Sequence, residues 1–324
     1  MLNSGRQGRA SPGGRALANA ATFLALLSVT ALLLGALGRW FWPFDLLAHA
    51  RVHCAAVLFA AALVFAALRN WQSAAIALLA MLLAAVPLLD YLMPARAASV
   101  AAAAEPTLKA LSFNIWFRND DPNRLVEYLD ASGADIVVLQ EMSEDEGRAL
   151  HAHLTAYPHA YLEGAGSSDT VLFSRWPIRD ATVVPLAEDA VGALCATIEW
   201  RDRQITVVGV HLHWPLGGTA AARRNAELAA LAAIAQLDEA PLIVLGDFNI
   251  TPWSAHFRRF VESSGLADCS LGHGLNPTWP SQALLFGIRI DHCFVSPQWR
   301  ALDARVGPAL GSDHRPLWVE LALQ

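Results

Sequence analysis

The chain has 324 residues, of which 55% are hydrophobic and 16% are charged, and its formal net charge is −6. This composition is too apolar for an ordinary soluble protein, and the acidic balance argues against strong nonspecific binding of nucleic acid. Two acids and seven arginines precede Glu105, so residues 105–324 contain 29 − 2 = 27 acids and 23 − 7 = 16 basic residues. We therefore expect an apolar first third and an acidic globular remainder.

Three apolar runs fill the first third of the chain. They are Ala16–Gly38, Val52–Leu68 and Ala74–Leu92. Each has roughly the 17–25 residues that a helix needs to cross a bilayer. A cleaved signal peptide is the other interpretation of the first run, because Arg6–Arg15 would supply a basic segment before it. The run is too long for that and two more follow, so we predict three transmembrane helices.

The domain organisation follows from these runs. We predict a membrane region over residues 1–94, a linker of low complexity over 95–106 and a globular domain over 107–324. Arginines near the ends of the runs are more numerous on the N-terminal side: Arg6, Arg9, Arg15 and Arg69 against Arg39, Arg51 and Arg96. Because basic residues favour the cytoplasmic side, the globular domain is expected on the periplasmic or exterior face.

From Leu108 onward, short apolar runs alternate with helical patterns. The predicted strands are Leu108–Phe113, Asp135–Leu139, Thr170–Phe173, Leu194–Glu199, Ile205–Val210, Leu242–Leu245, Ile290–Val295 and Leu317–Leu321. The predicted helices are Pro122–Asp130, Glu144–Leu154, Thr219–Leu237 and Ser254–Ser263, the last two with Thr219 and Ser254 as N-caps. Many strands with fewer helices indicate an α/β sandwich.

Polar groups close many of these strands, and they carry the chemistry. Those after strands are Asn114, Gln140-Glu141, His211 with His213, and Asp247 with Asn249. Asp291 is an acid inside an otherwise apolar strand, and Asp313-His314 belong to a polar turn that leads into the last strand. Singly, each can be read as a cap, a turn or a buried core histidine. Strand ends that open on one edge of a sheet converge, so we expect these side chains to meet. Carboxylates, amides and imidazoles without a thiolate cluster favour Mg²⁺ or Mn²⁺ over Zn²⁺.

In this order the motifs resemble those of the endonuclease/exonuclease/phosphatase superfamily. The resemblance covers Leu108 to the C-terminus and rests on Asn114, Gln140-Glu141, His211, Gly-Asp247-Phe-Asn249, Ile-Asp291-His and Ser-Asp313-His314-Arg-Pro. It implies the deoxyribonuclease I-like fold, two packed mixed β-sheets flanked by helices, here preceded by the three transmembrane helices. The membrane segment is similar to that of anchored bacterial members, which places the protein in the bacterial inner membrane.

The resemblance also implies a role for each motif residue. Glu141 would be the principal metal carboxylate, with Asn114 and Asp313 helping to hold metal or phosphate. His314, oriented by Asp291, would be the general base or the group that stabilises the transition state. Asp247 would position or activate the attacking water. Asn249 would contact a phosphoryl oxygen, and His211 would donate a hydrogen bond to the phosphoryl group.

The expected activity is therefore Mg²⁺- or Mn²⁺-dependent hydrolysis of a phosphodiester. Nucleic acid and phospholipid are both open as the substrate, and the bilayer is the only other partner that the sequence indicates. A non-catalytic membrane protein that uses the domain as a phosphate-binding module is the alternative. Two interpretations of His213 stay open, a second phosphate donor and a family-variable position. Two also stay open for three tryptophans, which either line the substrate groove or pack in the interior: Trp214, Trp253 and Trp279.

Overall fold

A computed structural model describes residues 11–94, 106–117, 122–163, 169–187, 191–237 and 239–324. The chain divides into two compact units, Met1–Leu89 and Asp90–Gln324. The predicted linker lies outside the described residues except for Pro106, and so do Arg6, Arg9 and Arg96. The linker and the orientation therefore remain predictions.

The first unit is helical. Its helices are α1 (Pro12–Ala36), α2 (Trp42–Ala48), α3 (Arg51–Ala67), α4 (Trp71–Ala85) and the short η1 (Val86–Leu88), which leads into α5 (Leu89–Leu92). Two segments, Pro12–Ala36 and Trp71–Leu92, are long and apolar enough to cross a membrane, and α2 with α3 forms a third only if this pair, bent by 57°, is one span. The second predicted helix is thus part of a bent pair. These helices indicate association with a membrane.

Small side chains let these helices pack closely. Ala21 of α1, Ala61 and Ala62 of α3, and Ala74 and Ala77 of α4 belong to one buried cluster. Lipid tails are as apolar as leucine, so helices in a bilayer associate through close backbone approach rather than through hydrophobic burial. Alanine at the contacts fits this requirement.

The second unit contains two six-stranded mixed sheets. The first has the order β11 (Trp299–Val306), β12 (Leu317–Leu323), β1 (Thr107–Asn114), β2 (Ile136–Gln140), β4 (Thr170–Ser174), β3 (His159–Tyr161). The second has the order β5 (Ile178–Val184), β6 (Ala193–Trp200), β7 (Arg203–His211), β8 (Leu242–Asp247), β10 (Asp291–Val295), β9 (Ala267–Asp268). Only β1 with β2 and β7 with β8 are parallel; the other neighbours are antiparallel.

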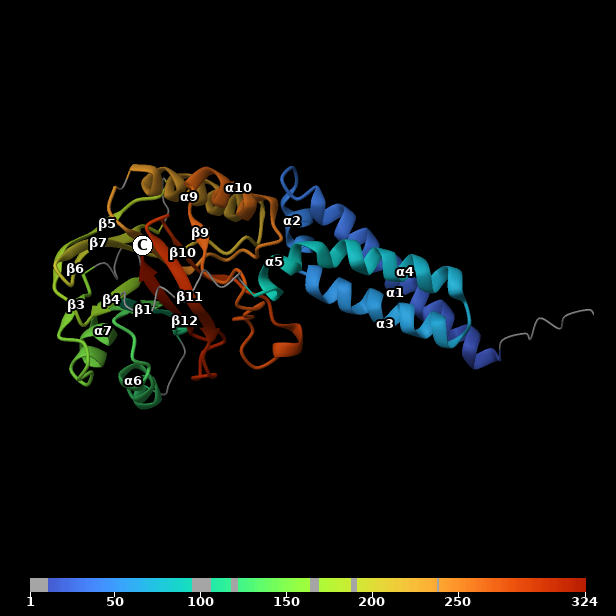
Figure 1. The fold of residues 1–324 in the computed structure, drawn as a ribbon, viewed down its shortest axis with the longest axis horizontal. Coiled ribbons are helices and arrows are strands. Elements are labelled where there is room, and N and C mark those ends of the chain that lie inside the picture. The colour runs from blue at the N-terminus through green and yellow to red at the C-terminus, as the bar shows by residue number, and fades with distance from the viewer. Residues whose placement is uncertain (1–10, 95–105, 118–121, 164–168, 188–190, 238) are drawn as a thin grey trace, which may run out of the picture. The chain divides into compact units, whose positions relative to one another are not determined.

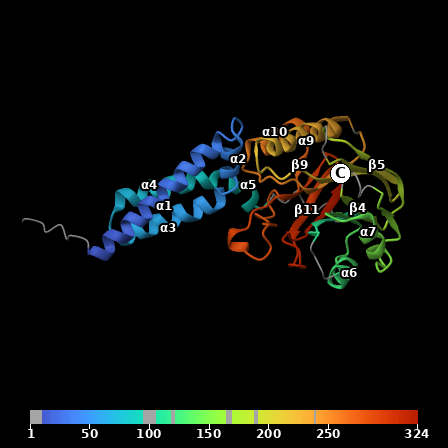
Figure 2. The same ribbon diagram turned by 180° about the vertical axis from the view of Figure 1, so that it is seen from behind.

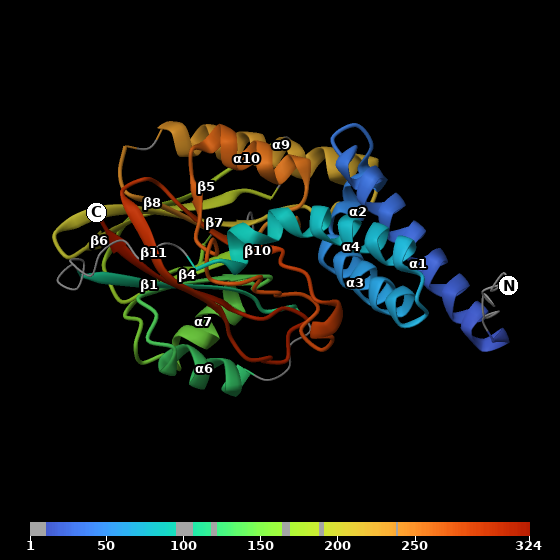
Figure 3. The same ribbon diagram turned by 45° about the vertical axis from the view of Figure 1, so that its right-hand side comes forward.

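Helices cover the outer face of each sheet. In Figures 1, 2 and 3, α9 (Gly218–Leu237) and α10 (Ala255–Ser264) lie side by side over one sheet, and α6 (Pro122–Ala131) and α7 (Glu144–His151) lie beyond the other. Leu231 and Phe260 pack on the second sheet, Leu129 packs on the first, and a separate apolar core fills the space between the sheets. The predicted architecture of two packed mixed sheets flanked by helices is confirmed.

The eight predicted strands are all present, and the four that were missed share one property. β3, β5, β9 and β11 are the edges of the two sheets. An edge strand is exposed along one side, so it needs no continuous apolar run; β5, for example, has no fully buried residue. Periodicity therefore finds the central strands and overlooks the edges.

Two local predictions about helix starts had different outcomes. Ser254 caps α10, where its hydroxyl accepts a hydrogen bond from the backbone N–H of His256. The assignment of Thr219 as an N-cap was wrong, because α9 already begins at Gly218. Asp291, expected inside a strand, does belong to β10 and is its first residue.

Candidate active site

The ends of β1 and β2 place Asn114 beside Glu141. The two strands are parallel, and Asn114 pairs with Gln140, the residue before Glu141. The Nδ2 of Asn114 donates to Oε1 of Glu141 at 2.9 Å. Glu141 has φ = 58°, a left-handed conformation that non-glycine residues seldom adopt. Such conformations persist where the surrounding structure imposes them, and they concentrate at functional sites.

The other parallel pair places His211 beside Asp247. Strands β7 and β8 are in register at these two residues, the last of each strand. Gly246 permits this approach, because a Cβ at that position would lie 1.9 Å from the carbonyl oxygen of Val210. Glycine is therefore required immediately before Asp247.

Asn249 folds back onto Asp247. Its φ is 50°, and its backbone N–H donates to Oδ1 of Asp247 at 2.8 Å. Its Nδ2 donates to the carbonyl of Leu212 at 2.8 Å and makes a longer contact of 3.4 Å with Oδ2 of Asp247. The second contact is weak, so this amide has one N–H that a stronger acceptor would take.

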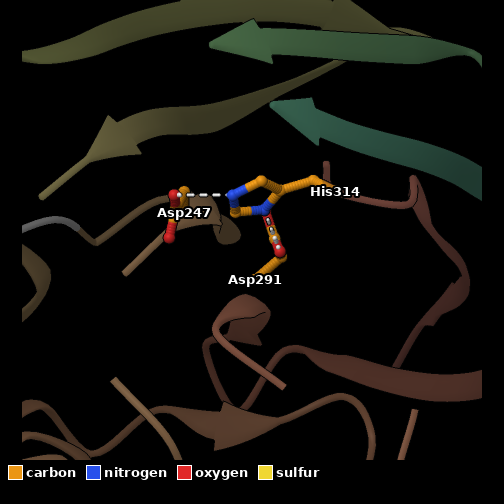
Figure 4. Close-up of side chains that lie close together, drawn as sticks. All are labelled: Asp247, Asp291 and His314. Carbon is orange, nitrogen blue, oxygen red and sulfur yellow. Dashed lines mark hydrogen bonds and ion pairs between the residues drawn. The ribbon is translucent and has the colours of Figure 1, made fainter. Parts of the chain in front are cut away.

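His314 lies between two carboxylates (Figure 4). Its Nδ1 is 2.8 Å from Oδ2 of Asp291, and its Nε2 is 3.7 Å from Oδ2 of Asp247. The turn that carries His314 is fixed by Ser312, whose hydroxyl donates to the carbonyl of Asn114 and accepts from the backbone N–H of His314. The end of β1 thus positions both the amide and the histidine.

The two sheets meet through direct contacts between these groups. The Nδ2 of Asn114 reaches Oδ2 of Asp247 at 3.2 Å, and Nε2 of His211 lies 3.9 Å from Oε1 of Glu141. The structure therefore brings together seven of the eight predicted site residues in one connected group. The side chain of the eighth, Asp313, accepts a hydrogen bond at 3.0 Å from the indole N–H of Trp279.

The carboxylates control the charge of the site. Burial alone would lower the pKa of His314, but the charges of Asp291 and Asp247 outweigh it and raise the pKa to about 10. Burial raises the pKa of Asp247 to about 6, against the opposing effect of His314. The proton on the His314 imidazole is therefore stabilised by the two carboxylates beside it, within one buried group.

The sequence did not predict the partner of His211, which is Asp169. Its Oδ2 lies 2.9 Å from Nδ1 of His211. Burial lowers the pKa of His211, but this hydrogen bond and the charge of Asp169 raise it to about 9. Asp169 directly precedes β4, which is antiparallel to β2 and begins beside Gln140. An acid before an antiparallel strand reaches the same edge as a residue after a parallel one, but the sequence alone does not say that β4 runs antiparallel to β2.

A second histidine–carboxylate pair supports the loop after β7. Glu227 of α9 is fully buried, and it accepts hydrogen bonds from the backbone N–H and the Nδ1 of His213. Arg224, one turn earlier and also fully buried, donates to the carbonyl of Asn249 at 3.2 Å. Helix α9 therefore positions the segments that contain His211 and Asn249.

The three tryptophans that follow site motifs differ in their surroundings. Trp253 is buried, so it packs in the interior. Trp279 is partly buried and binds Asp313, whereas Trp214 is 63% exposed. Only Trp214 is therefore free to contact a large substrate or a surface.

The donor set fits a hard divalent cation. Glu141 is the partly exposed carboxylate of the group, with 22% of its side chain exposed, and Oδ1 of the fully buried Asp291 has no partner among the described residues. Asp247, Asp291 and His314 have ligand atoms within 4.8 Å of one another. In that trio, however, Asp291 and His314 already bind each other. A cation held by Glu141, Asn114 and Asp313 would leave this pair intact, and oxygen donors of this kind suit Mg²⁺ or Mn²⁺.

Comparisons with known proteins gave a family match and several structures of similar fold. Residues 111–314 match the model of the Endonuclease/Exonuclease/phosphatase family. A Bacteroides vulgatus structure described as an endonuclease/exonuclease/phosphatase has 22% identity and a TM-score of 0.57, covering 68% of this chain and 100% of that one. None of the curated proteins compared with the chain matches it.

Two further structures share the fold. D. rerio TDP2 complexed with a single strand DNA product has 17% identity and a TM-score of 0.56, with 67% of this chain and 99% of that chain covered. Sphingomyelinase C from Streptomyces griseocarneus has 17% identity and a TM-score of 0.51, with 66% and 99% covered. At such identity these matches establish the fold and leave the substrate open.

Proposed function

The chain belongs to the endonuclease/exonuclease/phosphatase family, and from that premise we propose that it is a membrane-anchored, divalent-metal-dependent phosphodiesterase. The observation that carries the proposal is the connected group of Asn114, Glu141, Asp247 and His314, which come from both sheets. The substrate is a nucleic acid or a phospholipid. The site faces the periplasm or the cell exterior from the bacterial inner membrane.

The residues divide the work of in-line hydrolysis. Asp247 orients the attacking water, and His314 takes its proton or donates to the charge that develops on the phosphoryl oxygens. Asp291 fixes the tautomer and the orientation of His314 through Nδ1. His211, held by Asp169, donates to a phosphoryl oxygen together with the N–H of Asn249 that makes only the weak contact.

Glu141, with Asn114 and Asp313, would hold the cation. When bound, a divalent cation stabilises the negative charge that builds on the phosphoryl and leaving oxygens. Glu141 is suited to this role because its Oε1 and Oε2 are each fixed by one hydrogen bond, from Asn114 and from the backbone N–H of Phe117. The ligand is therefore already oriented before a cation arrives.

The test is an assay of the full-length protein in detergent with Mg²⁺ or with EDTA. The substrates are bis(4-nitrophenyl) phosphate, plasmid DNA, sphingomyelin and inositol phosphates. We expect cleavage that EDTA abolishes and that Glu141→Gln lowers by about a thousandfold or more, whereas the exposed control Glu262→Gln retains it. A folded protein that cleaves none of these substrates would leave the non-catalytic binding module as the function.

A further inference from the structure

Large apolar side chains are exposed mainly on three loops of the second unit. Among its described residues from Thr107 on, eight large hydrophobic side chains are exposed, and five belong to this group. The five are Phe117 after β1, Trp214 and Leu216 after β7, and Leu285 and Phe286 in η3 (Leu284–Phe286). The other three, Leu237, Leu271 and Leu302, occur singly elsewhere. We call the five residues the apolar rim.

Each of the three loops is hydrogen-bonded to a residue of the candidate active site. The backbone N–H of Phe117 donates to Oε2 of Glu141 at 3.1 Å. The loop that carries Trp214 begins at Leu212, whose carbonyl accepts from Asn249 at 2.8 Å. The rim residues on these two loops therefore border the metal ligand and the phosphoryl contact.

The third loop is hydrogen-bonded to Asp313. Trp279 donates its indole N–H to the Asp313 carboxylate at 3.0 Å, and the backbone N–H of Ser281 donates to the Asp313 carbonyl at 2.7 Å. Leu285 and Phe286 follow a few residues later, and the chain returns to the site at Asp291. All three loops thus leave from the edge of the sandwich where the catalytic side chains meet.

Exposure of this size needs a physical explanation. Phe117, Trp214 and Phe286 are 65%, 63% and 67% exposed, and Leu285 is 83% exposed. Single exposed apolar residues are ordinary, but a group around a catalytic site marks a surface that meets an apolar partner. Tryptophan, phenylalanine and leucine are also the side chains that enter the interface of a bilayer.

The composition of the chain favours a lipid bilayer over a nucleic acid as the partner of the apolar rim. The apolar segments Pro12–Ala36 and Trp71–Leu92 indicate that the chain associates with a membrane, so a bilayer is a partner that the chain itself points to. Residues 105–324 have 27 acids and 16 basic residues, which repel a polyanion such as DNA, whereas insertion into a zwitterionic lipid surface requires no basic patch. A phospholipid in that bilayer also presents a phosphodiester at the depth of the inserted side chains.

We propose that the apolar rim inserts into the interface of the bilayer in which the protein is anchored, so that the site acts on the phosphodiester of a phospholipid headgroup. The substrate part of this inference rests on the proposed phosphodiesterase activity, and the docking part does not. Two measurements therefore separate the two parts.

Docking is tested on the full-length protein reconstituted in phosphatidylcholine–phosphatidylethanolamine vesicles that contain lipid with nitroxide-labelled acyl chains. A fluorophore is attached at Leu285→Cys and, as the matched control, at Leu237→Cys, because both leucines are 83% exposed. The unsubstituted protein corrects for labelling of native cysteines. We expect quenching at position 285 to exceed that at 237 by about threefold or more. Equal quenching at the two positions would overturn the proposal, whatever the enzyme cleaves.

The substrate is tested by the ratio of phospholipid cleavage in these vesicles to cleavage of bis(4-nitrophenyl) phosphate. The combined variant Trp214→Ser, Leu285→Ser, Phe286→Ser is expected to lower this ratio about tenfold or more, whereas Leu237→Ser leaves it unchanged. An unaltered ratio would refute the inference. Wild-type protein that cleaves the soluble ester or DNA but no phospholipid would refute it too, while the phosphodiesterase proposal would stand. If nothing is cleaved, that proposal fails and the quenching result alone decides docking.

Discussion

Nδ1 of His314 lies 2.8 Å from Oδ2 of Asp291, and both side chains are buried. The carboxylate accepts from Nδ1, which leaves Nε2 directed at Asp247. We expect Asp291→Asn to lower kcat by about a hundredfold to ten-thousandfold with little change in KM, because the amide no longer selects the same tautomer. Steady-state kinetics on bis(4-nitrophenyl) phosphate provide the measurement.

The control for this variant is Asp145→Asn, since the side chain of Asp145 is 97% exposed and pairs with Arg148 on the surface of α7. It should retain the wild-type kcat. A variant Asp291→Asn with wild-type turnover would show that His314 needs no orienting partner. An unfolded variant is recognised by near-UV circular dichroism and would be replaced by Asp291→Glu.

Asp169 should matter less than Asp291. It binds Nδ1 of His211 at 2.9 Å, but 37% of its side chain is exposed, so water can take over part of its role. We expect Asp169→Asn to lower kcat by roughly tenfold to a hundredfold. If this variant lost as much activity as Asp291→Asn, the two histidines would contribute equally to the transition state.

Metal binding by Glu141 can be measured without turnover. Its carboxylate and that of Asp247 both contact the Nδ2 of Asn114, at 2.9 Å and 3.2 Å, and a divalent cation would offset the repulsion between them. A ligand at a hundred times its Kd stabilises the folded state by about 2.7 kcal/mol, so Mg²⁺ should raise the Tm of the wild type by several degrees relative to EDTA. The variant Glu141→Gln should show a much smaller shift, and Glu262→Gln a wild-type one. Equal shifts in all three proteins would place the cation elsewhere.

Much of this fold could be read from the sequence, because the central strands are buried on both faces. Strands β2 and β8 are continuous apolar runs that end in polar groups, and such runs need no knowledge of their neighbours. The edge strands β5 and β11 have mixed patterns, since one side of each has no neighbouring strand. Their position depends on the sheet that they join, which local sequence does not specify.

The candidate site was predictable for a related reason. Residues such as Asn114 and Asp247 close apolar strands, so their polarity is conspicuous. Asp169 and Glu227 also bind histidines in or beside the site. Their polarity is not conspicuous, because Asp169 lies in a polar segment before a strand and Glu227 lies within a helix. Their partners became visible only when the register of β2 with β4 and the packing of α9 were known.

His292 lies next to Asp291 but points away from the site. Its Nε2 is 2.8 Å from the carbonyl oxygen of Ile250, and its ring packs among Phe248, Phe257 and Phe294. Burial, and after it the charge of Arg289, lower the pKa of His292 from 6.5 to about 4, against the opposing charge of Asp268. The ring is therefore neutral in the folded protein at neutral pH.

This neutral histidine should make the domain sensitive to acid. Between pH 6.5 and about 4, the unfolded chain binds a proton at His292 that the folded chain does not, so stability is full above pH 6.5 and falls as the pH drops through this window. We expect His292→Gln, whose amide can still donate to Ile250, to show a smaller decrease in Tm between pH 7 and 4.5 than the wild type. Thermal melts of the full-length protein in detergent measure it. Parallel decreases in the two proteins would mean that His292 is protonated in the folded state.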